Sequence, residues 1–338
     1  MNRNLFVVGG RAKKDAQRKG GEHRYGSGVI LSVDGESGKA HRCVEYVTPA
    51  EACAADQDPS ILFKAATLEG NKLYACTQTE ILVYDLPAFE LETYISLPQL
   101  NDVHHVRPTP EGTLLIANTG LDMVMEVERD GSLRREWDVL GRQPWTRFSR
   151  AVDYRRILST KPHEAHPNFV FFDGDRVWTT RFEQRDAICL AEPDRRIAID
   201  IEAPHDGIVH GRKVYFTTVD GHIVKADLDR CSVESIIDLN DLAPTRAALG
   251  WCRGLEVLEE DQVIVGFSRL RPTPWRQNLS WLKKGIGRPG VLPARVAMYD
   301  LRKPALCWEH VVEPSGLDAV FSIHRGSTRF TPSERGVG

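Results

Sequence analysis

Histidines recur near the start of several short apolar segments of this chain, where their side chains could carry catalysis or bind a ligand. His104 and His105 lie in NDVHHV, His166 lies in HEAHPNF and His205 lies in APHDG. Imidazole can act as a nucleophile, a general base or a metal ligand near neutral pH. Histidines at equivalent places of repeated segments indicate one shared site.

The segments around these histidines belong to a pattern of short alternating or apolar runs, separated by Gly, Asp, Asn and Pro. Such a pattern is typical of all-β proteins. The runs group in fours, as in SILFKAATLEG, NKLYACTQTE, ILVYDLPAFE and LETYISLP. Four strands that recur every roughly 40 to 60 residues predict a β-propeller.

The two ends of the chain supply the last blade. GLDAVFSIHRG, near the C-terminus, resembles a first strand, and NLFVVGG, SGVILSVDG and AHRCVEYVTP at the N-terminus supply three more. Such a closure leaves no open sheet edge at the seam of the ring. We predict an all-β, six-bladed propeller over residues 1–326, with five or seven blades as the alternatives, and a disordered tail over 327–338.

The propeller geometry explains the recurrence of the histidines. The first strand of each blade lines the central channel, so residues at the starts of these strands meet at one mouth. We count back from the hairpin turn of five blades to find the residue at the mouth, and in the first blade we take Lys64. Each blade then contributes one polar residue: Lys64, His104, His166, His205, Arg253 and Asp318. His105 directly follows His104, and Arg181 ends a second strand that approaches the same mouth. His222 lies in a loop on that face, and His324 lies at the far end of its strand.

Three basic inserts interrupt the blade pattern, at residues 11–26, 140–163 and 270–293. By their places between strands they should converge over the mouth that carries the histidines. Arginines and lysines gathered there favour an anionic ligand, and tryptophans in the same inserts favour a contact surface. We expect a substrate to be bound by residues of the channel and of these inserts: Lys64, Arg147, Arg150, Arg253, Arg269 and Trp275.

Three functions are compatible with such a site. In the first, one histidine attacks a sulfuryl or phosphoryl group of a small anionic or aromatic substrate, and arginines hold the oxygens. In the second, His105, His166, His205 and Asp318 bind one Zn, Fe, Mn or Cu ion of a metal-dependent hydrolase, lyase or isomerase. In the third, the mouth binds a protein or a glycan without catalysis.

Part of the chain resembles the aryl-sulfate sulfotransferases, six-bladed propellers of bacteria. The resemblance covers residues 104–217 and rests on His104-His105, on His166-Pro167-Asn168 followed by Thr179-Thr180-Arg181, and on Pro204-His205-Asp206. It implies that His205 is a transiently sulfated nucleophile, and that His104 or His105, His166 and Arg181 hold the sulfuryl group. Pro204 departs from the Gln of the family motif. The stretch VIVGFSRLRPTPW also resembles a broad group of uncharacterised bacterial propeller proteins.

Composition narrows the class of protein further. The chain has 338 residues, of which 41% are hydrophobic and 27% are charged, and its net charge is −3. These values indicate a folded protein that does not bind nucleic acid. No apolar run is long enough to cross a membrane and no signal peptide is evident. Seven scattered cysteines without C-x-x-C indicate reduced thiols and a cytoplasmic protein.

Overall fold

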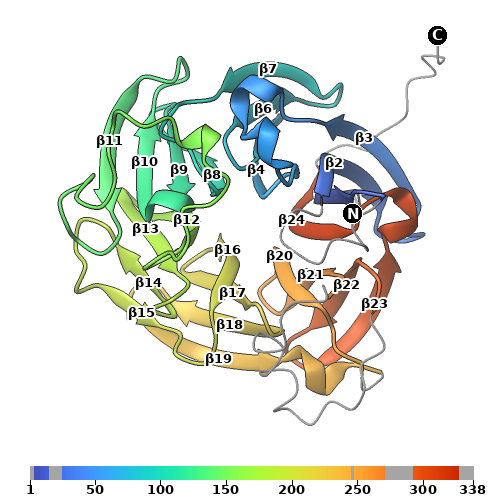
Figure 1. Ribbon diagram of the computed structural model, residues 1–338. Coiled ribbons are helices and arrows are strands. Elements are labelled where there is room, and N and C mark those ends of the chain that lie inside the picture. The colour runs from blue at the N-terminus through green and yellow to red at the C-terminus, as the bar shows by residue number, and fades with distance from the viewer. Residues whose placement is uncertain (1–3, 15–24, 245–246, 271–291, 327–338) are drawn as a thin grey trace.

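Six four-stranded antiparallel sheets stand around a central channel in the computed structural model (Figure 1), which describes residues 4–14, 25–244, 247–270 and 292–326. The protein is therefore a six-bladed β-propeller, and the predicted fold and blade number are confirmed. The inner strands line the channel and are β24 (Ala319–Arg325), β4 (Ala65–Glu69), β8 (Val103–Pro108), β12 (Pro167–Asp173), β16 (Pro204–His210) and β20 (Trp251–Glu259).

The remaining strands follow in order toward the rim of each blade. The second strands are β1 (Asn4–Ala12), β5 (Lys72–Cys76), β9 (Leu114–Asn118), β13 (Arg176–Arg181), β17 (Lys213–Thr218) and β21 (Gln262–Ser268). The third strands are β2 (Tyr25–Asp34), β6 (Ile81–Asp85), β10 (Met123–Val127), β14 (Asp186–Cys189), β18 (His222–Asp227) and β22 (Arg295–Asp300). The outer strands are β3 (Ala40–Tyr46), β7 (Glu90–Ile95), β11 (Leu133–Asp138), β15 (Arg196–Ala198), β19 (Ser232–Asp238) and β23 (Ala305–Val311).

The helical elements of the described residues are short 3-10 turns. They are η1 (Ala50–Ala52), η2 (Ala55–Gln57), η3 (Thr119–Leu121), η4 (Tyr154–Arg156), η5 (Leu239–Leu242) and η6 (Glu313–Ser315). Within the described ranges, no helix has the length and apolar character that a bilayer crossing requires.

Both ends of the chain build the closing blade, as predicted. The C-terminal strand β24 pairs with β1, so the sheet order is β24-β1-β2-β3. The backbones are close at this seam: a Cβ on Gly9 would lie 1.8 Å from the carbonyl oxygen of Ala319. Only a residue without a side chain fits there.

Hydrophobic side chains fill the spaces between neighbouring blades. One cluster joins Tyr74 and Ile81 of one blade to Val106 and Ile116 of the next. The strands alternate residues between the two faces of a blade, and both faces are covered by neighbours. This packing fixes the inner strands and therefore the depth at which their side chains enter the channel.

Candidate functional site

Irregularities in the inner strands aim side chains into the channel. In β8, β16 and β24 the pairing register shifts by one residue, which leaves His104, His205 and Phe321 as the extra residues. In β12 and β20 the shift spans two residues each, Asn168–Phe169 and Arg253–Gly254. A bulge bends a strand and re-aims its side chain. Five blades thus contribute a bulged residue to one cluster at the channel mouth.

The orientation of His104 follows from its hydrogen bonds. Asn168 donates its amide Nδ2 to the carbonyl oxygen of Pro204 at 3.1 Å, so its Oδ1 faces His104 Nδ1 at 2.5 Å. Because Oδ1 only accepts, His104 donates from Nδ1 and keeps a lone pair on Nε2. The Lys64 ammonium lies 2.9 Å from that Nε2 and donates to it.

Lys64 and Asp102 form a buried ion pair beside His104. The Lys64 Nζ lies 2.7 Å from Asp102 Oδ1. Burial opposes ionisation of Asp102, but the charge of Lys64 outweighs it and holds the pKa of the carboxyl well below its usual range. Burial, together with the Lys64 charge, lowers the pKa of His104 to about 4. His104 is therefore a neutral imidazole next to a charged pair.

A buried carboxylate positions His166. Asp122 accepts hydrogen bonds from the backbone N–H groups of Glu164, Ala165 and His166 at 2.8 to 3.0 Å, and Arg147 Nη1 lies 2.8 Å from Asp122 Oδ2. These bonds hold His166 in the left-handed region, with φ of 58°, which a residue with a side chain seldom adopts. The His166 ring lies 4.9 Å from the His104 ring, centroid to centroid.

His163 also belongs to the cluster, although the sequence patterns did not single it out. Its Nδ1 lies 3.1 Å from His166 Nδ1, and its Nε2 lies 3.4 Å from Thr160 Oγ1. Burial lowers the pKa of His163 and places that of His166 well below its usual value. The spacing HEAH, with two histidines three residues apart, was the available signal.

His205 belongs to the same cluster and has an unused nitrogen. Its ring is 5.8 Å from the His104 ring and 6.1 Å from the Phe321 ring, and the Arg253 guanidinium covers the same Phe321 ring at 4.2 Å. Only 6% of His205 is exposed, and its Nδ1 is buried without a hydrogen-bond partner among the described residues. Burial and then the charge of Arg253 place the pKa of His205 well below its usual value. His205 is thus also neutral.

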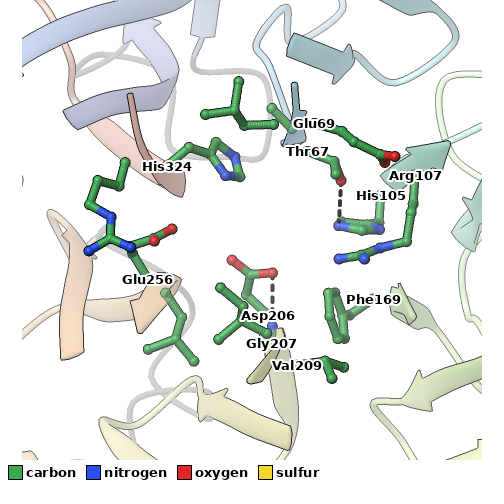
Figure 2. A pocket seen from close by; sticks show the side chains of 15 residues that line it. Thr67, Glu69, His105, Arg107, Phe169, Asp206, Gly207, Val209, Glu256 and His324 are labelled. Atoms are coloured by element: carbon green, nitrogen blue, oxygen red, sulfur yellow. Dashed lines mark hydrogen bonds between the residues drawn. The ribbon is translucent and has the colours of Figure 1, made fainter. Parts of the chain in front are cut away.

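His105 points away from this cluster. Thr67 Oγ1 donates to the carbonyl of Val106, so His105 Nε2, 3.4 Å away, donates to Thr67 Oγ1. The backbone N–H of Val170 faces His105 Nδ1 at 3.5 Å. Adjacent strand residues point to opposite sides, and His105 lines a cavity that His104, His166 and His205 do not line. Figure 2 shows it there beside Thr67 and Arg107. The expectation that it joins His166 and His205 is corrected.

Several of the cations predicted to bind a ligand form ion pairs with acidic side chains. Arg181 donates from Nε to Asp186 Oδ1 at 2.9 Å and contacts Asp186 Oδ2 at 2.6 Å, within its own blade. The remaining ion pairs join Arg147 to Asp122, Arg150 to Glu136 and Arg269 to Glu313. Each of these guanidinium groups is therefore paired with a carboxylate of the protein itself, and their binding of an anion stays a prediction.

The insert at 140–163 has a small core of its own. Trp145, Phe148 and Ile157 pack against buried Tyr154, Leu121 and Met123. Trp145 also donates from Nε1 to Glu136 at 2.9 Å. Trp145 therefore packs within the insert and helps to hold it in place. Trp275 and most of the inserts at 11–26 and 270–293 lie outside the described residues, as does the tail at 327–338.

The residues proposed as metal ligands do not form one donor set. His105 lies in the other half of the channel, and Asp318 Oδ2 accepts the backbone N–H of Ala12 at 2.7 Å. In the ranges that the structure describes, no group of three or more His, Cys, Asp or Glu side chains is arranged to hold a metal ion. The side chains present therefore do not fit the metal centre considered from the sequence.

Comparison with known proteins supports the fold. No family model and no curated protein matches the sequence. A solved protein of unknown function from Bacteroides caccae is 10% identical over 96% of this chain and 98% of its own, with a TM-score of 0.58. A catalytically inactive virginiamycin B lyase from Staphylococcus aureus, solved with quinupristin, is 11% identical over 91% and 85%, with a TM-score of 0.49. Neither is described as an aryl-sulfate sulfotransferase, and at 10% identity the likeness to the Bacteroides caccae protein extends to the fold alone.

Proposed function

We propose that the mouth of the channel is an active site for a small anionic substrate, at which His205 is the nucleophile. The observation that carries this proposal is the neutral, buried imidazole of His205, whose Nδ1 has no partner among the described residues. A polar atom left in this state costs about 1–3 kcal/mol. Such groups are typical of functional sites.

The surroundings of His205 suit attack on a sulfuryl or phosphoryl group. The lone pair of the neutral ring forms a bond to the sulfur or phosphorus atom, and the ester bond to the leaving oxygen breaks with its electron pair. The positive charges of Arg253 and Lys64 lie near His205 and lower its pKa; they would also stabilise oxygen atoms that gain negative charge. The hydroxyl oxygen of a second compound then bonds to the sulfur or phosphorus atom, the bond to the imidazole nitrogen breaks with its electron pair, and the hydroxyl proton passes to water.

Initial rates with p-nitrophenyl sulfate and p-nitrophenyl phosphate, with phenol as the acceptor, test this function. His205→Asn should lower kcat by roughly a thousandfold or more, because the nucleophile is lost. The matched control is His210→Asn, at the exposed opposite end of the same strand β16, which should keep the wild-type rate. Equal rates in the two variants, or no turnover of either ester by the wild-type protein, would contradict the proposal.

A further inference from the structure

A second cavity occupies the other half of the channel. Its volume is about 400 Å³, and it lies beyond the histidine cluster along the inner strands. Residues from the inner strands of all six blades line it, among them Thr67, His105, Arg107, Asp206, Glu256 and His324 (Figure 2). Cavities of this size with a few convergent polar groups are typical of small-molecule sites.

Arg107 supplies a positive charge at this cavity. Its guanidinium points into the cavity in Figure 2 and lies 5.8 Å from the centre of the Phe169 ring. Its Nε is buried, and no described residue donates to, accepts from or ion-pairs with the side chain. Burial lowers the pKa of Arg107, whereas the negative charges of Glu69 and Asp206 raise it. A guanidinium so placed lacks the planar oxygen partner that it binds best.

Acceptor groups face the same cavity from other blades. Asp206 is 7% exposed, and its carboxylate accepts the backbone N–H of Gly207 at 2.9 Å. Burial raises its pKa to about 7. The ring of His324 points into the cavity, and its Nε2 is buried without a partner among the described residues. Burial lowers the pKa of His324 to about 4, so this histidine is neutral.

The wall between the charged groups is apolar. Phe169 lies against Gly207, where an added Cβ would come within 2.8 Å of the ring. Leu255 and Val209 also line the cavity. A ligand that reaches from Asp206 to Arg107 would therefore lay a hydrocarbon segment against Phe169.

We propose that this cavity binds a small zwitterion of the ω-amino acid type, with an ammonium group at Asp206 and His324 and a carboxylate at Arg107. Arg107 and Asp206 attract each other across the cavity, but no hydrogen bond or ion pair joins them among the described residues. A simple anion would give a direct partner to Arg107 alone, and a simple amine would give one to Asp206 alone. A ligand with both charges gives both buried groups a direct hydrogen-bonded partner.

This site is separate from the one assigned to His205. His205 and Asp206 are neighbours on β16, and their side chains point to opposite halves of the channel. Binding at the second site can therefore be measured without any turnover at the first.

Isothermal titration calorimetry of the full chain tests the proposal with glycine, β-alanine, γ-aminobutyrate, δ-aminovalerate and ε-aminocaproate as probes. Butylamine and butyrate serve as the single-charge controls. We expect at least one zwitterion to bind about tenfold or more tightly than either control, because each control forfeits one charged hydrogen-bonded contact. Binding of none of the five, or equal binding of a single-charge control, would overturn the proposal. These comparisons need no variant and do not depend on its folding.

Two variants then locate the bound zwitterion. Arg107→Gln and Asp206→Asn should each weaken its affinity by about tenfold or more. The control is Arg135→Gln on the outer strand β11, whose side chain is 60% exposed, and its affinity should equal that of the wild type. Unchanged affinity in both Arg107→Gln and Asp206→Asn, with thermal melting that shows both to be folded, would place the ligand elsewhere and overturn the assignment.

Discussion

At the level of single residues, burial determines which groups at the channel carry charge. His104, His166 and His205 are neutral because each is nearly excluded from water and lies near the Lys64 ammonium. A neutral imidazole has a lone pair to donate, whereas a protonated one does not. The reactive state that a nucleophile requires is thus the resting state of His205.

The sequence could indicate the types of these residues but not their charge states. His104, His166 and His205 were singled out because they recur at strand starts, and the structure brings them together. Asn168, which fixes the tautomer of His104, comes from a neighbouring blade, and Asp102, which pairs with Lys64 beside His104, comes from a loop. Nothing in the local sequence pattern marks them as partners of His104.

Asp206 makes the stability of the protein depend on pH. Its pKa is raised from 3.8 to about 7 by burial, so the unfolded chain releases the proton first. Stability should fall as pH rises from about 4 to 7 and then level off, with a loss of about 4 kcal/mol at most. Glu256, with a pKa also raised to about 7 by burial, contributes in the same window.

Asp206→Asn measures how much of the pH-dependent loss of stability is due to Asp206. The amide keeps an acceptor for the Gly207 N–H and cannot ionise, so the variant should lose less stability than the wild type between pH 5 and pH 8. Urea unfolding at both pH values measures the difference. If the two proteins lose equal stability over this interval, Asp206 does not titrate as described.

At the level of elements, strand bulges and loop carboxylates position the cluster. The bulged residues of β8, β16 and β24 are His104, His205 and Phe321. Counting back from hairpin turns assumes regular strands, so it selected Asp318 where the structure presents Phe321. The place of a bulge depends on pairing with the neighbouring strand, which one strand's own sequence does not specify.

The loop before β12 depends on Asp122, whose side chain is fully buried. Asp122→Ala should destabilise the protein by about 3–5 kcal/mol, since it leaves the Arg147 charge and three backbone N–H groups without their acceptor. Asp122→Asn keeps one acceptor oxygen and should cost less. Chemical denaturation of both variants measures this order. A cost below 1 kcal/mol for Asp122→Ala would show that the loop does not depend on this carboxylate.

At the level of the whole molecule, the fold was predictable because its signal is distributed over the chain. Alternating runs in groups of four, with turn residues between them, recur around the entire ring, so errors in single strands do not alter the result. The arginines of the 140–163 insert and Arg269 show the opposite case. Their charge was visible in the sequence, but the carboxylates that neutralise them lie mostly on distant strands or loops.

The seam between β24 and β1 holds the ring closed, and Gly9 is its narrowest point. Gly9→Ala should destabilise the protein by about 1–3 kcal/mol or more, because the new methyl group meets the Ala319 carbonyl at 1.8 Å. Gly26→Ala is the control, because its nearest neighbour is the flexible Lys13 side chain at 3.3 Å. Thermal unfolding compares the two. Equal melting temperatures would mean that the seam opens without cost to the fold.

The central claim is that His205 accepts a group from the substrate, and a covalent adduct tests it most directly. The protein is mixed with p-nitrophenyl sulfate without an acceptor, quenched, and analysed by intact-mass and peptide mass spectrometry. The account predicts one added sulfuryl group per chain, carried by the peptide that contains His205 and absent from His205→Asn but not from His210→Asn. An adduct on another residue, or turnover of the ester without any adduct in the quenched wild-type protein, would contradict it.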